Sequence, residues 1–239
     1  MKIALIGYGR MGQAIEKLAI KRGHRVSMRI DKDSDQSIND ISSENTDVII
    51  EFTNPEVAYD NLHQAVQTGV PCISGTTGWL DRYHELCNEV NAANGAFLYA
   101  SNFSIGVNLF FALNQHLAKL MSAQADYAVS MEEIHHIHKL DAPSGTAITL
   151  AEQIIDQHSA VQKWINDRVE DDDTIGIVSK RAGEVAGTHS IRYESDIDQI
   201  TITHEAFSRQ GFALGAVMAA EWLQGKSGIY TMTDVLSLK

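Results

Sequence analysis

Residues 135–147, with the sequence HHIHKLDAPSGTA, concentrate groups that bind anions and transfer protons. The three histidines titrate close to neutral pH, and Lys139 adds a positive charge beside them. The Pro-Ser-Gly-Thr sequence that follows predicts the start of a helix with Ser144 as its N-cap. Because N–H groups at a helix start bind carboxylates, this segment predicts a site that holds an anionic substrate and gives it a proton.

Two other interpretations of this segment remain open from the residues alone. Three histidines in four positions resemble metal ligands, and a solvated polar loop would also contain such residues. His135 and His136 point to opposite faces in an extended chain, the sequence has no H-E-x-x-H spacing, and Lys139 would repel a dication. We therefore predict no metal site.

A glycine-rich turn near the N-terminus, GYGRMG at residues 7–12, fits G-x-G-x-x-G between a predicted strand and a predicted helix. The first glycine allows a tight turn, the second lets a pyrophosphate approach, and the third lets helix and strand pack closely. Asp31 ends the next predicted strand, where a carboxylate binds the adenine ribose. Lys32 and Arg10 could neutralise a 2′-phosphate, so the choice between NADH and NADPH stays open. The alternative is an ordinary turn between a strand and a helix, in which the glycines serve packing only. The position of Asp31, 19 residues after Gly12, disfavours this alternative.

Two later strand ends also belong to the predicted dinucleotide site. Phe52-Thr53-Asn54 and Gly75-Thr76-Thr77-Gly78 fall where loops at the carboxyl edge of such a sheet face the cofactor. Their hydroxyl groups suit contacts with the nicotinamide end, although a Thr-Thr turn can also be a helix cap.

The first hundred residues alternate between apolar runs and amphipathic segments, which predicts a parallel, doubly wound α/β sheet. We expect the region 32–45 to be an irregular link. The predicted strands are 2–7, 25–30, 47–52, 71–74 and 96–100, and the predicted helices are 11–22, 56–67 and 80–91.

The pattern changes after residue 102 and predicts a second α+β domain. Strands without helices between them pair in a mixed or antiparallel sheet. The acidic run 170–173 lacks the spacing of a calcium loop, which favours a solvated loop. The predicted helices are 106–120, one covering residues 147–155, and 212–223, and the predicted strands are 127–134, 175–180, 188–193 and 199–206.

Composition narrows the function classes. The formal net charge of −12 opposes binding to nucleic acid or to an acidic membrane surface, so we expect neither partner. No apolar run is long enough to span a bilayer. Cys72 and Cys87 form no Cys-x-x-Cys pair, and the first residues lead directly into a strand, so we expect a cytoplasmic protein without a signal peptide.

The sequence around the histidine segment, EIHHIHKLDAPSGTA, closely resembles the signature of the 4-hydroxy-tetrahydrodipicolinate reductase (dihydrodipicolinate reductase) family of lysine and diaminopimelate synthesis. The resemblance covers nearly the whole chain. It includes GYGRMG, GTTGW at 75–79, SNFSIGVN at 101–108, RAGEVAGTH at 181–189, THEAFSR at 203–209 and GIYTMTDVL at 228–236. Two departures lie near the adenosine half: the glycine turn is one residue shorter than the family's form, and the segment after Asp31 is abbreviated.

The resemblance implies a role for each matching residue. His135 and Lys139 match the family's proton-transfer residues, and His136 with Ser144, Gly145 and Thr146 resembles its substrate-binding residues. The cofactor contacts expected from the residues and the resemblance together are Gly7, Tyr8, Gly9, Arg10, Met11, Gly12, Asp31, Lys32, Phe52, Thr53, Gly75, Thr76, Thr77, Ala100, Ser101, Asn102 and Phe103.

The resemblance also implies a domain arrangement and an oligomer. Residues 1–103, completed by 212–239, would bind NADH or NADPH, and residues 104–211 would bind substrate and oligomerise. The expected hinges are 103–104 and 209–212. Family members are typically homotetramers whose second domains pair their sheets, and closure of the domains would exclude water.

The expected reaction is hydride transfer from the nicotinamide to C4 of a cyclic imine dicarboxylate, followed by protonation at C3. Lys139 is the preferred proton donor, and His135 would orient or recharge it, although the sequence leaves their roles interchangeable. Two alternatives remain: a two-domain dehydrogenase resembling aspartate dehydrogenase, and a dinucleotide-binding sensor without turnover. A dehydrogenase of the first kind has no need of the HHxxxK run, and a sensor has no need of a dense group of titratable side chains. Both features therefore favour the reductase.

Overall fold

The computed structural model describes residues 1–169, 171, 173–208 and 210–238, and the chain divides into two compact units. The first unit comprises Met1–Asn108 with Gln210–Lys239, and the second comprises Leu109–Arg209. The C-terminal segment of the chain therefore completes the unit that the N-terminal segment begins.

The first unit contains a six-stranded sheet in the order β11-β5-β4-β3-β1-β2. All of its neighbouring strands pair in parallel, as the alternation of apolar runs and amphipathic segments predicted. The strands are β1 (Lys2–Ile6), β2 (Arg25–Ile30), β3 (Val48–Glu51), β4 (Cys72–Ser74), β5 (Ala96–Tyr99) and β11 (Gly228–Tyr230).

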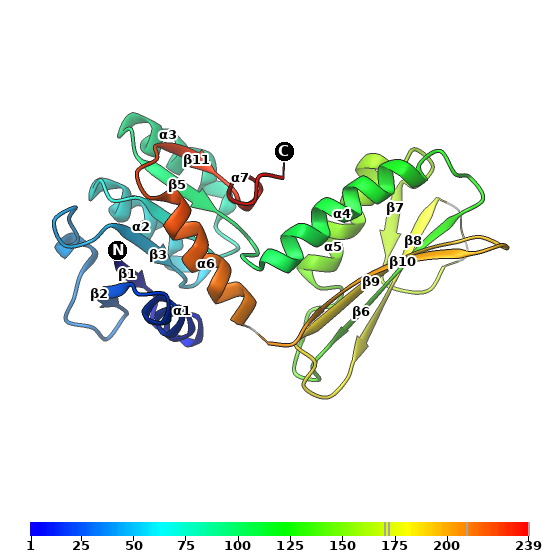
Figure 1. Cartoon of the computed structure of the whole chain (residues 1–239), viewed down its shortest axis with the longest axis horizontal. Helices are drawn as coiled ribbons and strands as arrows, with labels where there is room; N and C mark the ends of the chain where they lie inside the picture. The colour runs from blue at the N-terminus through cyan, green and yellow to red at the C-terminus, as the bar shows by residue number, and fades with distance from the viewer. Residues whose placement is uncertain (170, 172, 209, 239) are drawn as a thin grey trace. The chain divides into compact units, whose positions relative to one another are not determined.

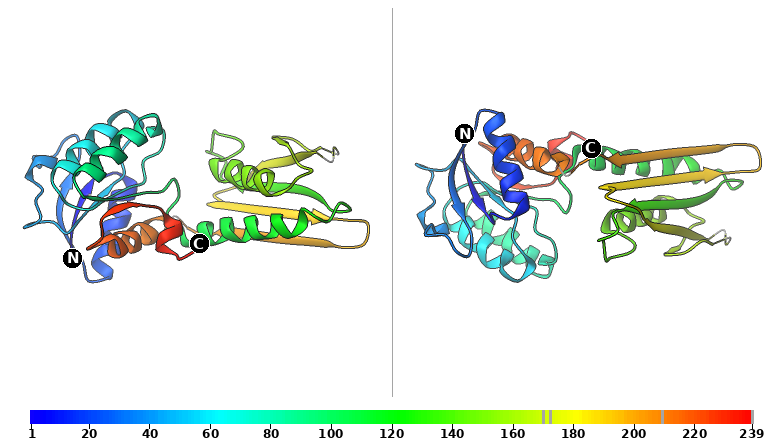
Figure 2. Two further views of the ribbon diagram at one scale, coloured as in Figure 1. Left: turned by 90° about the horizontal axis from the view of Figure 1, so that it is seen from above. Right: turned by 90° about the horizontal axis from the view of Figure 1, so that it is seen from below.

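Helices cover both faces of this sheet (Figure 2), which confirms the doubly wound arrangement. α1 (Arg10–Lys21) and α6 (Gln210–Leu223) pack against one face, and α2 (Pro55–Gln67) and α3 (Tyr83–Ala92) pack against the other. The strands are apolar almost throughout because both of their faces are buried. The short elements are η1 (Ile38–Asp40), η2 (Leu80–Arg82) and α7 (Met232–Val235).

The second unit contains a five-stranded mixed sheet in the order β10-β9-β6-β8-β7. β9 pairs antiparallel with β10 and β6, whereas β8 pairs parallel with β6 and β7, so the predicted mixed sheet is confirmed. The strands are β6 (Ala128–His135), β7 (Lys163–Ile165), β8 (Thr174–Arg181), β9 (Gly187–Glu194) and β10 (Gln199–Ala206).

α4 (Ile105–Met121) and α5 (Gly145–Gln157) lie along one face of this sheet (Figure 1). Their apolar side chains form one core with alternate residues of the central strands, such as Met131, Ile177 and Ile191. The intervening strand residues, such as Ser130 and Arg192, are exposed on the opposite face. One face of the second sheet is therefore polar.

Several short elements differ from the sequence-based expectation. β7, β11 and α7 have three or four residues each, too few for a hydrophobic period to be recognised. The predicted irregular link 32–45 contains η1, and its Ile38 and Ile41 are buried in the core. The predicted loop 170–173 lies partly outside the described residues. Among the described residues, no helix combines the length and apolarity needed to cross a membrane.

Candidate functional site

The glycine-rich turn between β1 and α1 has the conformation that a phosphate-binding loop needs. Gly7 has a positive φ of 90°, and a Cβ there would lie 2.0 Å from the Phe52 carbonyl oxygen. A Cβ on Gly12 would lie 2.3 Å from the Gly7 carbonyl oxygen, so this glycine allows the helix to start close to the strand end. Gly9 is the N-cap of α1, and a Cβ there would meet nothing within 4 Å. The turn therefore leaves open space beside the free N–H groups of the helix.

A pocket of about 470 Å³ lies beside this turn and contains part of the predicted cofactor site. Asp31 lies on its rim and accepts hydrogen bonds from the N–H groups of Tyr8, at 3.2 Å, and Lys32, at 2.8 Å. These bonds hold the carboxylate in place beside the pocket. The lining residues are Ile6, Gly7, Gly9, Ile30, Asp31, Lys32, Phe52, Thr53, Asn54, Val57 and Asn61.

Of the seventeen predicted cofactor residues, six line this pocket and eleven do not, and Tyr8, Arg10 and Met11 are among the eleven. Arg10 instead lines a shallow pocket of about 460 Å³ along α1, together with Lys17 and Lys21. Met11 packs against the core of the first unit. The Tyr8 hydroxyl donates a hydrogen bond to Glu16, while its backbone N–H contacts Asp31.

Glu51, at the end of β3, joins two of the predicted cofactor loops and was not predicted from the sequence. It is fully buried and accepts hydrogen bonds from the hydroxyls of Ser74, at 2.6 Å, Thr76, at 2.7 Å, and Thr53. Burial raises the pKa of its carboxyl group, while these hydrogen bonds oppose the rise. Its position at a strand end, next to a Phe-Thr pair, is the sequence signal that could have identified it.

The segment after β5 contacts Phe52 through Phe103. The Phe103 ring lies 5.6 Å from the Phe52 ring, measured between centroids. Gly215 of α6 allows a close approach, because a Cβ there would lie 1.7 Å from the Phe103 carbonyl oxygen. Asn102 accepts a hydrogen bond from the Ser104 N–H at 2.9 Å. Ala100 is buried, whereas Ser101, Thr77 and Gly78 are exposed.

In the second unit, strand register brings a group of polar side chains together at one end of the sheet. β6 continues to His135, one residue beyond the prediction, so Glu133 and His135 project from the same face. Glu133 is paired in register with Ser179 of β8 and with His189 of β9. These three residues continue the face on which Met131, Ile177 and Ile191 form the core. Here the apolar layer gives way to a buried polar one.

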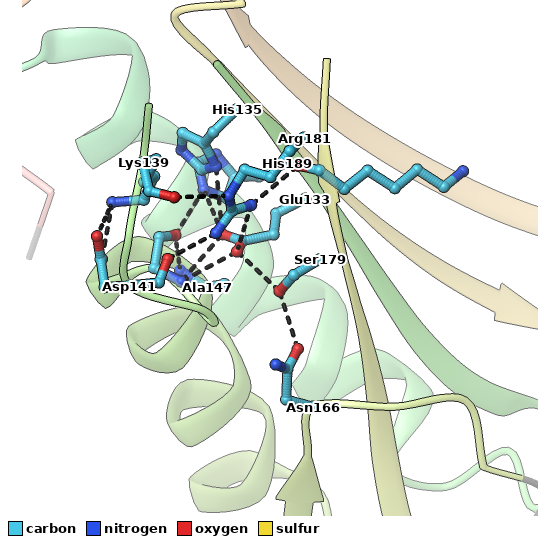
Figure 3. Close-up of polar contacts among 11 residues, drawn as sticks. Glu133, His135, Lys139, Asp141, Ala147, Asn166, Ser179, Arg181 and His189 are labelled. Atoms are coloured by element: carbon cyan, nitrogen blue, oxygen red, sulfur yellow. Dashed lines mark hydrogen bonds and ion pairs between the residues drawn. The ribbon is translucent and has the colours of Figure 1, made fainter. Parts of the chain in front are cut away.

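The two predicted proton-transfer residues lie beside this layer in different surroundings (Figure 3). His135 is buried, and its Nδ1 lies 3.5 Å from Glu133 Oε2. Gly187 makes room for the ring, since a Cβ there would lie 3.1 Å from His135 Nε2. Lys139 is half-buried, and its ammonium group donates hydrogen bonds to both oxygens of Asp141 at 2.8 and 2.7 Å.

Arg181 holds the loop that carries Lys139. Its guanidinium group donates hydrogen bonds to the carbonyl oxygens of Lys139, at 3.2 Å, and Asp141, at 2.6 Å. It also lies 3.6 Å from Glu133 Oε1. Planar, multidentate contacts of this kind are characteristic of arginine, so the guanidinium fixes the loop relative to the end of the sheet.

The start of α5 supplies the other part of the predicted substrate site. Ser144 is the N-cap, as predicted, and its Oγ accepts a hydrogen bond from the Ala147 N–H at 3.2 Å. Gly145 is exposed, and a Cβ there would meet nothing within 4 Å, so the first turn has free space before it. Amides in that turn have no carbonyl group of the helix to bind. His136 is half-buried, and its ring lies 6.0 Å from that of the exposed His138.

The protonation states of the buried layer follow from its contacts. Burial opposes ionisation of Glu133, but hydrogen bonds from Ser144 and Ser179 and the charge of His135 keep its pKa below the usual value. Burial lowers the pKa of His135, and the neighbouring Glu133 carboxylate partly reverses this effect. Burial and the charge of His135 lower the pKa of His189 to about 4. At neutral pH the layer therefore contains a carboxylate beside two neutral imidazoles.

The sequence analysis assigned no role to Glu133, Arg181 or His189, although all three lie in segments that carry the family resemblance. The alternation of β6 places Glu133 two residues before His135, and this spacing is the signal that could have identified it. The contributions of Arg181 and His189 depend on pairing between strands, which one segment of sequence does not specify.

Known proteins match this chain over nearly its whole length. The model of the dihydrodipicolinate reductase N-terminus matches residues 1–103, and that of the C-terminus matches residues 106–236. The 4-hydroxy-tetrahydrodipicolinate reductase of Christiangramia forsetii is 52% identical over 237 residues, covering 99% of this chain and 98% of that protein. The one from Neisseria meningitidis is 33% identical, covering 100% of this chain and 98% of that protein.

Solved structures share the fold. The dipicolinate-bound dihydrodipicolinate reductase from Paenisporosarcina has a TM-score of 0.75, with 22% identity and 98% coverage of both chains. Aspartate dehydrogenase from Thermotoga maritima has a TM-score of 0.51, with 15% identity, and covers 95% of this chain and 97% of that one. Both likenesses are of fold alone. The two family models together match nearly all of the sequence, and this chain belongs to the dihydrodipicolinate reductase family.

Proposed function

We propose that His135 and Lys139 transfer the proton in the reaction of this enzyme, the NAD(P)H-dependent reduction of 4-hydroxy-tetrahydrodipicolinate to tetrahydrodipicolinate and water. The 4-hydroxyl group leaves as water, and the conjugated cyclic imine that results accepts the hydride at C4 and the proton at C3. The reductase activity is that of the family to which the chain belongs, and the pathway is lysine and diaminopimelate biosynthesis. The observation that carries the assignment of roles is that His135, the Lys139 loop and the start of α5 meet at one end of the second sheet (Figure 3).

The first unit has the features of a dinucleotide site. The pocket of about 470 Å³ combines open space at Gly9 with the fixed carboxylate of Asp31, which suits a pyrophosphate next to a ribose. The Lys32 ammonium group, beside the same pocket, can pair with a 2′-phosphate, so the residues present can bind either NADH or NADPH. Bound NAD(P)H supplies the hydride that reaches C4 of the substrate.

The second unit suits a dicarboxylate substrate. The amides of Gly145 and Thr146, at the exposed start of α5, can bind one carboxylate, and His136 can bind the other. The ammonium group of Lys139 is paired with the Asp141 carboxylate. It therefore has to leave Asp141 before it can contact the substrate. His135, held beside Glu133, can orient Lys139 or replace its proton. The proton is delivered to C3 of the enamine.

The polar face of the second sheet supports the expected homotetramer. The described residues leave a groove of about 510 Å³ on this face, lined by charged and hydroxyl side chains that include Glu132, Arg192 and Thr201. No helix of the second unit covers this face among the residues that the structure describes, because α4 and α5 contribute to the core on the other face. We propose that pairs of such sheets associate in the tetramer.

The proposed function is tested by coupling the protein to a dihydrodipicolinate-forming synthase and following NADH and NADPH absorbance. Consumption of neither cofactor would exclude the reductase activity. Lys139→Ala and His135→Ala should each lower kcat by about 10²- to 10⁴-fold, the usual contribution of a positioned acid–base group. Cofactor affinity, measured by fluorescence titration, should change less than about threefold in both variants because the dinucleotide pocket belongs to the first unit. A large loss of cofactor binding would contradict the assignment of cofactor binding to the first unit and of substrate binding to the second.

A further inference from the structure

Glu133 is a buried carboxylate for which the proposed reaction has so far given no role. Its exposed fraction is 0%, and it lies two residues before His135 on the same face of β6. Taking an isolated carboxylate out of water is costly, so a buried one has to be compensated by donors and positive charges. The donors and positive charges around Glu133 therefore identify the parts of the structure that this carboxylate positions.

Glu133 contacts groups from β6, β8, β9 and the start of α5 (Figure 3). The backbone N–H of Ser144, at the start of α5, lies 3.1 Å from each of its oxygens, and the Ser179 hydroxyl donates to Oε1 at 2.8 Å. Ionisable groups complete its surroundings: His135 Nδ1 at 3.5 Å, Arg181 Nη1 at 3.6 Å and His189 Nε2 at 3.7 Å.

The contact with His135 determines which ring nitrogen can exchange a proton. A carboxylate beside Nδ1 favours the form in which Nδ1 carries the hydrogen, whether the ring is neutral or charged. The separation of 3.5 Å is an ion-pair distance rather than a hydrogen bond, and among the described residues Nδ1 has no hydrogen-bond partner. Exchange with Lys139 or with substrate then takes place at Nε2, the nitrogen for which Gly187 leaves room.

The contact with Ser144 determines where α5 begins. Both carboxylate oxygens face the Ser144 N–H, which immediately precedes the amides of Gly145 and Thr146. Hydrogen bonds from backbone amides to a charged group are stronger than bonds between neutral groups. Displacement of Glu133 would therefore move the helix start as well as the imidazole.

From these contacts we infer that Glu133 is a positioning residue for the reduction: one buried carboxylate fixes both the His135 ring, with its proton on Nδ1, and the start of α5 that binds the substrate carboxylate. This inference rests on the proposed function. Under this inference the side chain of Glu133 connects the proposed proton-transfer residue His135 to the proposed substrate-binding turn at the start of α5.

A metal ion is the competing explanation of the same cluster. Glu133, His135 and His189 each offer a ligand atom, and the three atoms lie within 4.8 Å of one another. The Arg181 guanidinium already provides a positive charge 3.6 Å from Glu133 Oε1, and a dication at this place would be repelled by it. The Glu133 oxygens also already accept hydrogen bonds from Ser144 and Ser179. These contacts favour a hydrogen-bonded carboxylate.

The inference predicts a specific effect of Glu133→Gln in the full-length enzyme. Glutamine keeps the size and an acceptor for the Ser144 N–H but removes the charge, so kcat should fall on the order of 10- to 100-fold, part of the contribution of an acid–base group. The groups that face His135 are Glu133, Lys139, Asp141, Arg181 and His189. Because the Glu133 charge raises the pKa of His135, the limb of the kcat/KM profile that reports His135 should move to lower pH.

Two further variants separate positioning from a general loss of structure. Glu133→Asp keeps the charge, so its kcat should be higher than that of Glu133→Gln. The limb of its kcat/KM profile that reports His135 should lie at the wild-type pH. Glu152→Gln removes an exposed carboxylate of α5 and should leave both unchanged. Circular dichroism and thermal unfolding establish that each variant is folded.

Three results would overturn the inference. Glu133→Gln could retain the wild-type kcat and pH profile, or Glu133→Gln and Glu133→Asp could lose activity equally with no shift of the limb. Loss of wild-type activity in EDTA, with recovery on addition of Zn²⁺, would instead identify the cluster as a metal site. Wild-type turnover in the same assay is required first, so a failure of the proposed function is distinguished from a failure of this inference.

Discussion

Individual side chains in the second unit divide between buried groups and groups that the substrate can reach. His135 and Glu133 are buried at the end of β6, whereas Lys139 pairs with the exposed Asp141. A buried pair fixes geometry, and an exposed pair can exchange its partner for a substrate carboxylate at little cost. This difference favours Lys139 as the group that contacts substrate and His135 as the group that orients or recharges it.

His189 gives the site a dependence of stability on pH. Its pKa of about 4 in the folded chain lies below the value of about 6.5 for an unfolded chain. As pH falls below about 6.5, the unfolded state takes up a proton that the folded state refuses, so the stabilising contribution is lost between about 6.5 and 4. From this residue alone, the free energy of unfolding should fall by about 2 kcal/mol between pH 7.5 and pH 5.

Urea denaturation at the two pH values measures this effect. Burial also lowers the pKa values of His158 and His204, so these residues add to the loss in the same direction. The matched variant His189→Gln should lose less stability than the wild type over the same range. An equal loss in both proteins would show that His189 is not the group responsible.

The site residues could be predicted from sequence only as far as they share one segment. The run from His135 to Thr146 is continuous, and it contains both proposed proton-transfer residues and the N-cap Ser144. Glu51, Arg181 and His189 acquire their roles through partners on other strands, and that pairing is a property of the folded sheet. Sequence alone therefore brought together the residues of one segment but not their partners on other strands.

At the scale of elements, long periodic segments were predicted well and short ones were not. β2 and β10 have the predicted bounds, because their apolar runs are bordered by turn residues. β7 and β11 are three residues long and pair only at the edges of their sheets. An edge strand this short has too few residues to display a period, so its assignment depends on the neighbouring strand.

The single-residue extension of β6 matters most for function. The predicted strand ended at 134, which left His135 in a loop, whereas the strand ends at His135 and pairs it with Arg181. Side chains two apart on a strand share a face, so the extension puts Glu133 next to His135. The boundary of one element thus determines the contact on which the positioning role of Glu133 depends.

At the scale of the whole molecule, the homotetramer proposed from the family resemblance would use the polar face of the second sheet for contacts between subunits. Light scattering of the purified protein should give four times the chain mass of 26.3 kDa. Ser130→Arg places a bulky charge in the middle of this face, on the central strand β6, and should produce smaller species with an unchanged fold. If the wild-type protein is a monomer at micromolar concentration, or if the Ser130→Arg variant remains a tetramer, the polar face does not form the contact between subunits.

The central claim is that the enzyme adds a hydride to C4 of the cyclic imine while its own residues supply a proton at C3. The most direct measurement uses NAD(P)H carrying deuterium on the transferred position of nicotinamide C4, with mass spectrometry and NMR of the tetrahydrodipicolinate formed. We predict one deuterium per product molecule, bound at C4. A product with deuterium at another carbon, or with none, would contradict the proposed reaction.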